Sequence, residues 1–254
     1  MRRIALPVET SAPAGTTNAY LLGAGESVLV DPATPGIADR LDPADVDHVA
    51  VTHTHRDHVG GVAQVAAASD ATVWARRGRA DRFVDATGVE PDRTFREGTA
   101  LGASGVDVVE TPGHAPDHVA FETPAGVACG DLAVAAGSVA VSAPEGDLRA
   151  YLVSLRRLLA RAPDRLLPGH GPVVDDPPGT LSRLLAHRRD RERRVLDAVR
   201  AGAHTPGAVV DAAYDKDLSG VRDLARATVV AHLEKLAAEG RVRWDPDAGR
   251  VAPA

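Results

Sequence analysis

The feature that most constrains this chain is a cluster of three histidines and one aspartate, which fills four of the six positions from 53 to 58 in the segment VTHTHRDHVGG. An apolar run from Val46 to Val51 leads straight into the cluster, which predicts a strand that ends where the cluster begins. The segment GGVAQVAAA after it predicts a short helix. We therefore expect the cluster on a loop at the end of a strand, where loops often carry catalytic and binding residues.

Three later segments supply similar side chains: TPGHAPDHV contains His114, CGD contains Asp131 and LPGHGP contains His170. Each of these residues lies beside a glycine, which fits a backbone pressed close to a compact site. Cys129 is the only cysteine, so a metal must be held by histidine and carboxylate. These ligand types suit zinc, with manganese or iron as alternatives. The candidate ligands are His53, His55, Asp57, His58, His114, Asp131 and His170.

The remaining sequence divides into a part with many strands and a part with mainly helices. Asp147 is expected to cap a helix whose leucines recur at spacings of four, three and four. After the proline-rich segment DDPPG (175–179), the order helix, helix, helix, hairpin is that of a winged helix-turn-helix. We expect a catalytic domain at 1–178 and a winged-helix-like domain at 179–254. Short apolar runs predict strands at residues 20–22, 27–30, 46–51, 72–75, 106–110, 118–121, 126–129 and 165–167, and the C-terminal helices are expected at about 181–200, from 206 and at about 222–239.

His-x-His-x-Asp-His followed by Gly-Gly, with the histidine, aspartate and histidine of the later segments, strongly resembles the metallo-β-lactamase superfamily. The resemblance implies an α+β fold, an αββα sandwich in which two sheets lie back to back with helices outside. It also implies two bound metal ions, with zinc first, that share a hydroxide able to attack the substrate. Carried over position by position, it places His53, His55 and His114 on the first metal and Asp57, His58 and His170 on the second, with Asp131 as a bridge and Asp57 also as a catalytic residue.

Two further residues lie near the expected ligands in the sequence. His118 lies four residues after His114, and it either holds a ligand in place or is a structural histidine on a strand. Cys129 lies within an apolar strand, so we interpret it as a small buried residue rather than a nucleophile.

The C-terminal segments HRRDRERRVLDAV, HTPGAVVDAAY and VVAHLEKLAAEGRVRW, with TTNAYLL near the start, resemble the β-lactamase-like-protein-2 group of this superfamily. That resemblance implies an endoribonuclease with single-stranded RNA as the leading substrate. Two alternatives stay open: a hydrolase of thioesters, lactones or other acyl compounds with glyoxalase II-like chemistry, and a nucleic-acid-binding protein with a non-catalytic lactamase scaffold. Antibiotic hydrolysis is not expected, because no signal peptide is recognised and aspartate replaces the cysteine ligand of several zinc β-lactamases.

The charge pattern is compatible with an anionic partner but does not require one. The net charge is −6, yet residues 179–254 hold 14 basic and 11 acidic residues, whereas residues 1–178 hold 15 and 24. The exposed face expected for the third C-terminal helix is nearly neutral, so we do not expect sequence-specific DNA binding. With no apolar run long enough for a membrane span, we expect a cytoplasmic protein that acts on a small-molecule or RNA substrate. Its winged helix would cap the cleft or form a homodimer.

An arginine-rich stretch on the first C-terminal helix allows two interpretations. These side chains either steer a phosphate backbone or form a solvated helix face, and we favour the solvated face. The residues are Arg188, Arg189, Arg191, Arg193 and Arg194.

Overall fold

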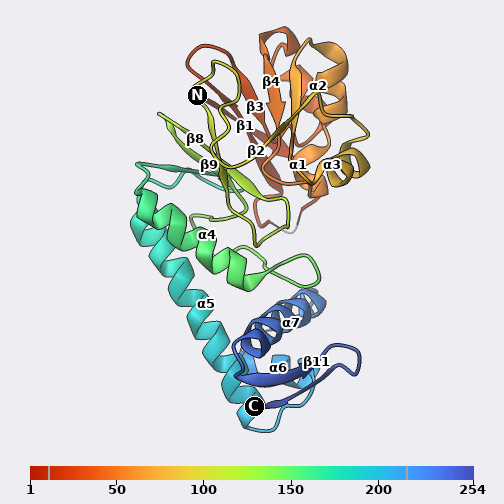
Figure 1. Cartoon of the computed structure of the whole chain (residues 1–254), viewed down its shortest axis with the longest axis vertical. Coiled ribbons are helices and arrows are strands. Elements are labelled where there is room, and N and C mark those ends of the chain that lie inside the picture. Colours follow the sequence, from red (N-terminus) through yellow and green to blue (C-terminus); the bar gives the residue numbers. More distant parts are fainter. Residues whose placement is uncertain (11, 216) are drawn as a thin grey trace.

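The computed structural model describes residues 1–10, 12–215 and 217–254. Two β-sheets occupy the upper part of the molecule in Figure 1, and long helices with a small hairpin extend below them. The first sheet has the order β1-β2-β3-β4-β5-β6, and its strands are Arg2–Pro7, Thr16–Leu22, Val28–Val30, His48–Ala50, Thr72–Arg76 and Arg93–Phe95. The second sheet has the order β10-β9-β8-β7, and its strands from β7 to β10 are Asp107–Glu110, Val119–Thr123, Gly126–Gly130 and Leu166–Pro168.

Helices cover the outer face of each sheet. On the first sheet these are α1, α2 and α3, at Arg56–Val59, Val62–Ala68 and Ala80–Thr87, with two 3₁₀ turns at Pro35–Asp39 and Pro43–Asp45. On the second sheet they are α4, at Leu148–Arg161, and the first half of α5, at Pro177–Arg200.

The alternation of side chains along the strands explains this layering. Val28 and Val30 of β3 point into the apolar core between the sheets, whereas Leu29 belongs to the core beneath the helices of the first sheet. The core between the sheets contains the buried rings of Phe95 and Phe121, which meet edge to face at 5.9 Å. The αββα sandwich expected from the family resemblance is confirmed.

The C-terminal part has a core of its own. It is formed by the second half of α5, by α6 (Pro206–Ala213) and α7 (Arg222–Ala238), and by the hairpin β11–β12 (Val242–Asp245 and Arg250–Pro253). Asp176 caps α5 by accepting from the Gly179 amide, so the proline-rich segment is the first turn of this helix. Helix α5 therefore runs through the expected boundary at 178/179, and that division stays a prediction.

Most elements expected from the sequence are present, and the structure differs from the expectations in the following points. Asp57 and His58 lie on the short helix α1, so the expectation of a loop is wrong for these two residues, although His53 and His55 do precede the helix. Strands β1 and β6 at the first sheet's edges, helix α3 and the two 3₁₀ turns were not expected. The solvated-face interpretation is wrong for Arg188, which is only 3% exposed.

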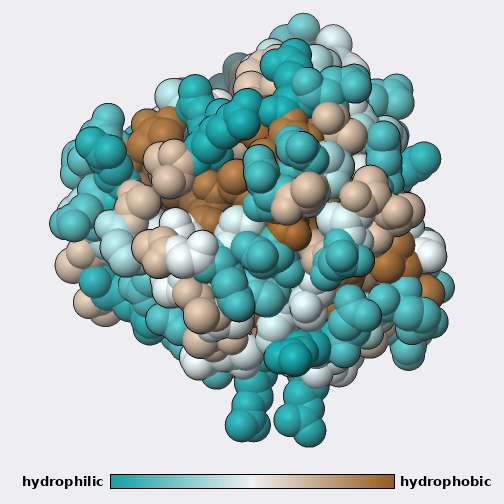
Figure 2. Space-filling model, turned by 90° about the horizontal axis from the view of Figure 1, so that it is seen from above, coloured by the Kyte–Doolittle hydropathy of each residue, from teal (hydrophilic) through white to brown (hydrophobic). Residues whose placement is uncertain are grey.

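The sheet topology brings the expected ligands to one edge of the sandwich. β4 runs parallel to β3 and ends at Ala50, just before the histidine cluster. β9 and β10 are also parallel, with Pro168 opposite Gly130, so Asp131 and His170 emerge side by side. The end of the molecule seen in Figure 2 is mostly hydrophilic, with its apolar side chains in small separate patches. Among the described helices, none combines the length and apolarity that a membrane crossing requires.

Candidate metal centre

The structure brings all seven predicted ligands together, in overlapping groups of three whose ligand atoms lie within 4.8 Å of one another. They come from four places in the fold: the β4–α1 segment, the β7–β8 loop, the end of β9 and the end of β10. The groups are His53, His55 and His114; His53, His58 and Asp131; and Asp57, His58 and His170.

In the first group three ring nitrogens converge on one point. His55 Nδ1 lies 3.0 Å from His53 Nε2 and 2.9 Å from His114 Nε2. Because neutral imidazole has one N–H and one lone pair, an acceptor at the outer nitrogen holds the proton there and leaves the lone pair on the inner nitrogen.

The outer nitrogen of each of these three rings lies within hydrogen-bond distance of a protein oxygen. Thr52 gives its own hydroxyl proton to Asp31, so its oxygen accepts the Nδ1–H of His53 at 3.0 Å. His114 Nδ1 donates to the Ala140 carbonyl at 2.7 Å, and His55 Nε2 lies 3.1 Å from Glu145 Oε2. Three lone pairs therefore face one another, which favours a cation between them.

The group of Asp57, His58 and His170 has the same design. His58 Nδ1 contacts Asp31 Oδ2 at 2.9 Å, and His170 Nδ1 donates to the Thr16 carbonyl at 2.8 Å. The inner Nε2 atom of His170 lies 3.5 Å from Asp57 Oδ2. His58 Nε2 is buried and makes no hydrogen bond within the described part of the chain.

Asp131 lies between the group that contains His55 and His114 and the group that contains Asp57 and His170. Its Oδ2 is 3.5 Å from His114 Nε2, and its Oδ1 is 3.4 Å from His170 Nε2 and 3.7 Å from His58 Nε2. Oδ1 is buried and has no hydrogen-bond partner among the described residues. One carboxylate thus faces both groups, the position that a bridging ligand needs.

The electrostatics of the centre favour bound cations. Burial lowers the pKa of His58, but Asp31, Asp131 and Asp57 outweigh it and raise the pKa to about 9. Burial alone would raise the pKa of Asp131, yet neighbouring histidines hold it below its usual range. The surplus of carboxylate around His58 is a negative field that metal ions would balance.

Asp31 is a site residue that the sequence reasoning missed. It directly follows the strand β3, is 1% exposed and has a φ of +53°, in the left-handed region that Asp and Asn tolerate better than other side chains. Its carboxylate accepts from the Thr52 amide, the Thr52 hydroxyl and His58. Its position directly after a strand that pairs with β4 was the available signal.

Arg82, Asp117 and Glu145 form a cluster of charged side chains beside the metal centre that the sequence did not indicate. Arg82 on α3 donates to Glu145 at 2.8 and 3.0 Å and to Thr54 Oγ1 at 2.8 Å, and it pairs with the buried Asp117 at 3.3 Å. Arg82 therefore contacts residues of three loops around the centre, and one of these residues, Glu145, in turn contacts His55.

His118 holds the backbone of Asp131. Its Nδ1 contacts Thr111, and its Nε2 accepts the Asp131 amide at 3.1 Å, so the ring has its proton on Nδ1. Burial first, and His114 next, lower the pKa of this ring to about 3. Of its two predicted roles, the geometry therefore matches the holding of a ligand.

The glycines and the cysteine behave as expected. A Cβ at Gly130 would lie 2.5 Å from Thr52 Oγ1, and one at Gly169 would lie 2.7 Å from His58 Cε1, so only glycine fits at either place. Cys129 is buried, and burial raises the pKa of its thiol to about 12. The interpretation of Cys129 as a small packed residue is consistent with this.

The fold and this site define a metal-dependent hydrolase with a winged helix attached. The chain belongs to the metallo-beta-lactamase superfamily, whose model matches residues 12–170. A second model, the beta-lactamase associated winged helix domain, matches residues 205–250.

The similarity to known proteins covers most of the chain. A beta-lactamase-like protein 2 homolog from Drosophila melanogaster is 31% identical over 89% of this chain and 84% of its own length. A protein of Emericella nidulans named thioesterase pkgB is 32% identical over 70% of this chain and 53% of its own length. The crystal structure of a metallo-beta-lactamase family protein from Thermus thermophilus matches 99% of this chain and 98% of its own, with a TM-score of 0.80 and 25% identity.

Proposed function

We propose that this chain is a hydrolase with two metal ions, one held by His53, His55 and His114 and the other by Asp57, His58 and His170, with Asp131 shared. The observation that carries the proposal is the orientation of the five histidines. Each presents its outer nitrogen to a protein oxygen and its inner nitrogen to the centre. Nitrogen and carboxylate ligands favour zinc, with manganese or iron as alternatives.

The residues of the chain divide the work of hydrolysis. Two bound cations would lower the pKa of a water that they share and attract the charge that develops on the substrate oxygen. Asp57 has a side chain 18% exposed, against 11% for Asp131, so it is the more exposed of the two ligand carboxylates and the one suited to take a proton from an attacking water. Asp31, Thr52 and His118 hold the ligands in place.

The leading substrate class is single-stranded RNA, and acyl thioesters are the second. Similarity to a beta-lactamase-like protein 2 homolog over 89% of this chain, the winged helix included, supports the first choice. The relative named a thioesterase supports the second. Sequence-specific DNA binding is still not expected, because Lys235 of α7 is paired with Glu192 at 2.7 Å and Glu239 at 2.8 Å.

The test is turnover of labelled single-stranded RNA and of a panel of thioesters by the zinc-loaded protein, with Asp57→Ala in parallel. We expect the variant to lose at least about 10²-fold in kcat/KM, the range found for a lost general acid or base. Asp45→Ala removes an exposed carboxylate elsewhere and should behave as the wild type. Full activity in Asp57→Ala would refute the proposal, and RNA left intact beside thioester turnover would select the second substrate class.

A further inference from the structure

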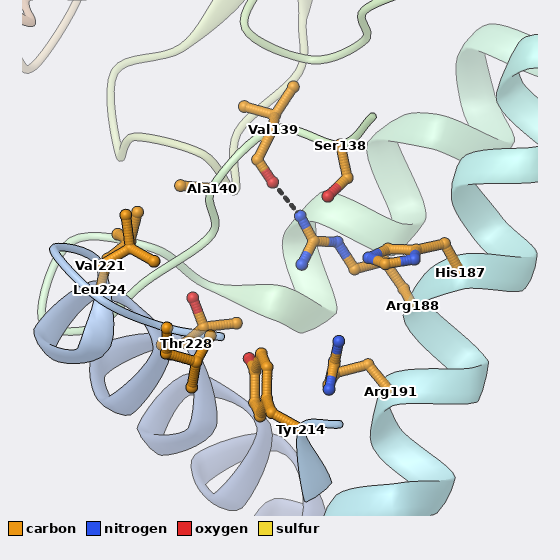
Figure 3. A pocket seen from close by; sticks show the side chains of 12 residues that line it. Ser138, Val139, Ala140, His187, Arg188, Arg191, Tyr214, Val221, Leu224 and Thr228 are labelled. Carbon is orange, nitrogen blue, oxygen red and sulfur yellow. Dashed lines mark hydrogen bonds between the residues drawn. The ribbon is translucent and has the colours of Figure 1, made fainter. Parts of the chain in front are cut away.

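A cavity of about 170 Å³ lies where the winged helix meets the lactamase fold. Its walls are the segment before α4, one side of α5, the α6–α7 connection and the start of α7, as Figure 3 shows. Two arginines, a histidine, a tyrosine and two hydroxyl-bearing residues line it, and no residue of this lining is acidic. The polar residues are Ser138, His187, Arg188, Arg191, Tyr214 and Thr228.

Arg188 is a buried cation without a carboxylate partner among the described residues. It is 3% exposed, donates one N–H to the Val139 carbonyl and lies over the Tyr151 ring at 5.3 Å. Its Nε is buried and makes no hydrogen bond within the described chain. Buried charges in proteins are normally paired, because desolvation costs several kcal/mol per ion, so this guanidinium calls for an anion.

Arg191 adds a second positive charge at the same place. It donates to the Ala213 carbonyl at 2.7 Å and stacks on Tyr214 at 3.6 Å, again with no ion pair to any described residue. Two other arginines of this stretch differ: Arg193 and Arg194 pair with Asp190, and Arg194 also pairs with Asp215. The field of Arg188 and Arg191 adds to burial in lowering the pKa of the nearby His232 to about 3.

The cavity and the metal centre share a wall. Val139 accepts from Arg188, and the next carbonyl, that of Ala140, accepts from His114. Ser138, Val139 and Ala140 all line the cavity. A group bound there would therefore lie one backbone segment away from a metal ligand.

We propose that this cavity is a subsite for a phosphate group of the substrate, bound by Arg188 and Arg191 with the hydroxyls of Ser138 and Thr228. Guanidinium groups present paired N–H donors that match phosphate oxygens. The volume is below the roughly 300–1,000 Å³ of pockets for drug-sized ligands, so it suits one such group rather than a whole substrate. The subsite deepens the hydrolase function proposed above and rests on it for its link to turnover.

Two substrates could supply the phosphate: an internucleotide phosphate of RNA or a phosphate of a coenzyme A thioester. Phosphate binding itself is measured first, on the zinc-loaded ¹⁵N-labelled full chain, by titrating inorganic phosphate at constant ionic strength and following the amides of Ala140, Tyr214 and Thr228. We expect saturable chemical-shift changes in the wild type, and the phosphate affinity that they report should fall about tenfold in Arg191→Gln. Arg189→Gln, which removes an exposed arginine of the same helix, should match the wild type.

Arg188→Gln should weaken binding as well, but its partly exposed neighbour Arg191 gives the test that does not depend on a buried substitution. Phosphate that binds only at the metals would shift the amides near His55 equally in wild type and Arg191→Gln, with no saturable shift at the cavity. That result, or equal shifts with acetate, would overturn the subsite.

Kinetics then identify the source of the phosphate. KM is compared for RNA, a coenzyme A thioester and an N-acetylcysteamine thioester, which carries no phosphate. Arg191→Gln should raise KM about tenfold for the phosphate-bearing substrate that the protein hydrolyses, whereas kcat for that substrate should not change. KM for the phosphate-free thioester should also not change. An equal change for all substrates would overturn the role in substrate binding. A lack of turnover with all three would count against the hydrolase proposal, while the titration still decides phosphate binding.

Discussion

At the scale of single residues, the site depends on oxygens that orient its histidines. Asp31 is the most connected of them, because its two carboxylate oxygens serve Thr52 twice and His58 once. Thr52 in turn fixes the ring of His53. One carboxylate outside the seven expected ligands therefore sets the tautomers of histidines in both groups.

Asp31→Asn tests this role with little change in shape. Asparagine tolerates the left-handed backbone found here, but its amide nitrogen cannot accept the His58 and Thr52 protons that now share one oxygen. We expect zinc affinity to fall by about 10–100-fold, the usual cost of losing such a partner. Competition with a chelator of known affinity measures it, and the exposed Asp45→Asn is the control. Unchanged zinc affinity would show that the contacts of Asp31 only stabilise the fold.

At the scale of elements, sequence patterns predicted those helices and strands that short stretches of the chain determine. The strands around residues 20–30 and the helix capped by Asp147 were predicted, because apolar runs and a capping side chain mark them in the sequence. β1 alternates buried Ile4 and Leu6 with exposed residues, but it ends in proline and depends on pairing with β2. Arg82 and Glu145 are 63 positions apart, so only the fold brings them to the centre.

Helix α7 contains a buried histidine that makes a pH-dependent contribution to stability. Both ring nitrogens of His232 are buried without a hydrogen bond in the described residues. Burial, then Arg188, Arg191, Lys235 and His187, lower its pKa from 6.5 to about 3. Between pH 6.5 and about pH 3 the unfolded chain therefore binds a proton at this histidine that the folded chain does not bind. The free energy of unfolding decreases as the pH is lowered across this window.

His232→Leu should remove that term. Relative to the wild type, the variant should gain up to about 1.4 kcal/mol in free energy of unfolding per pH unit below 6.5, the limit for one proton. At pH 7.5 the two should differ little, because an apolar side chain of similar size replaces an unsatisfied polar one. Urea unfolding at pH 7.5, 6.0 and 5.0 measures this, with the exposed His204→Leu as control. Parallel pH profiles of wild type and His232→Leu would contradict the assignment.

At the scale of the whole molecule, two cores share one helix. Leu181, Leu184 and Leu185 of α5 pack beneath the second sheet, whereas Val195 and Val199 pack in the C-terminal core. A backbone hydrogen bond from Ala143 to Ala227 and the contacts of α4 with α7 also cross the junction. The arginine-lined cavity lies at this junction, so the contact between the cores is incompletely packed.

The chain contains two tryptophans, one in each core, which makes the cores separately observable. Trp74 belongs to the core between the sheets, and Trp244 packs against the C-terminal core. In Trp244→Phe the remaining fluorescence reports the lactamase fold, and in Trp74→Phe it reports the winged helix. All seven candidate ligands belong to the first of these units.

Removal of zinc should therefore lower the urea midpoint reported by Trp74 much more than the one reported by Trp244. A ligand that binds only the folded state at 1,000 times its dissociation constant stabilises that state by about 4 kcal/mol, and chelation withdraws this stabilisation. The C-terminal core contains none of the seven candidate metal ligands and keeps its own apolar contacts, so its midpoint should change little. Equal shifts at both probes would mean that α5 joins the cores into one cooperative unit, and the division at 178/179 would then fail as a folding boundary.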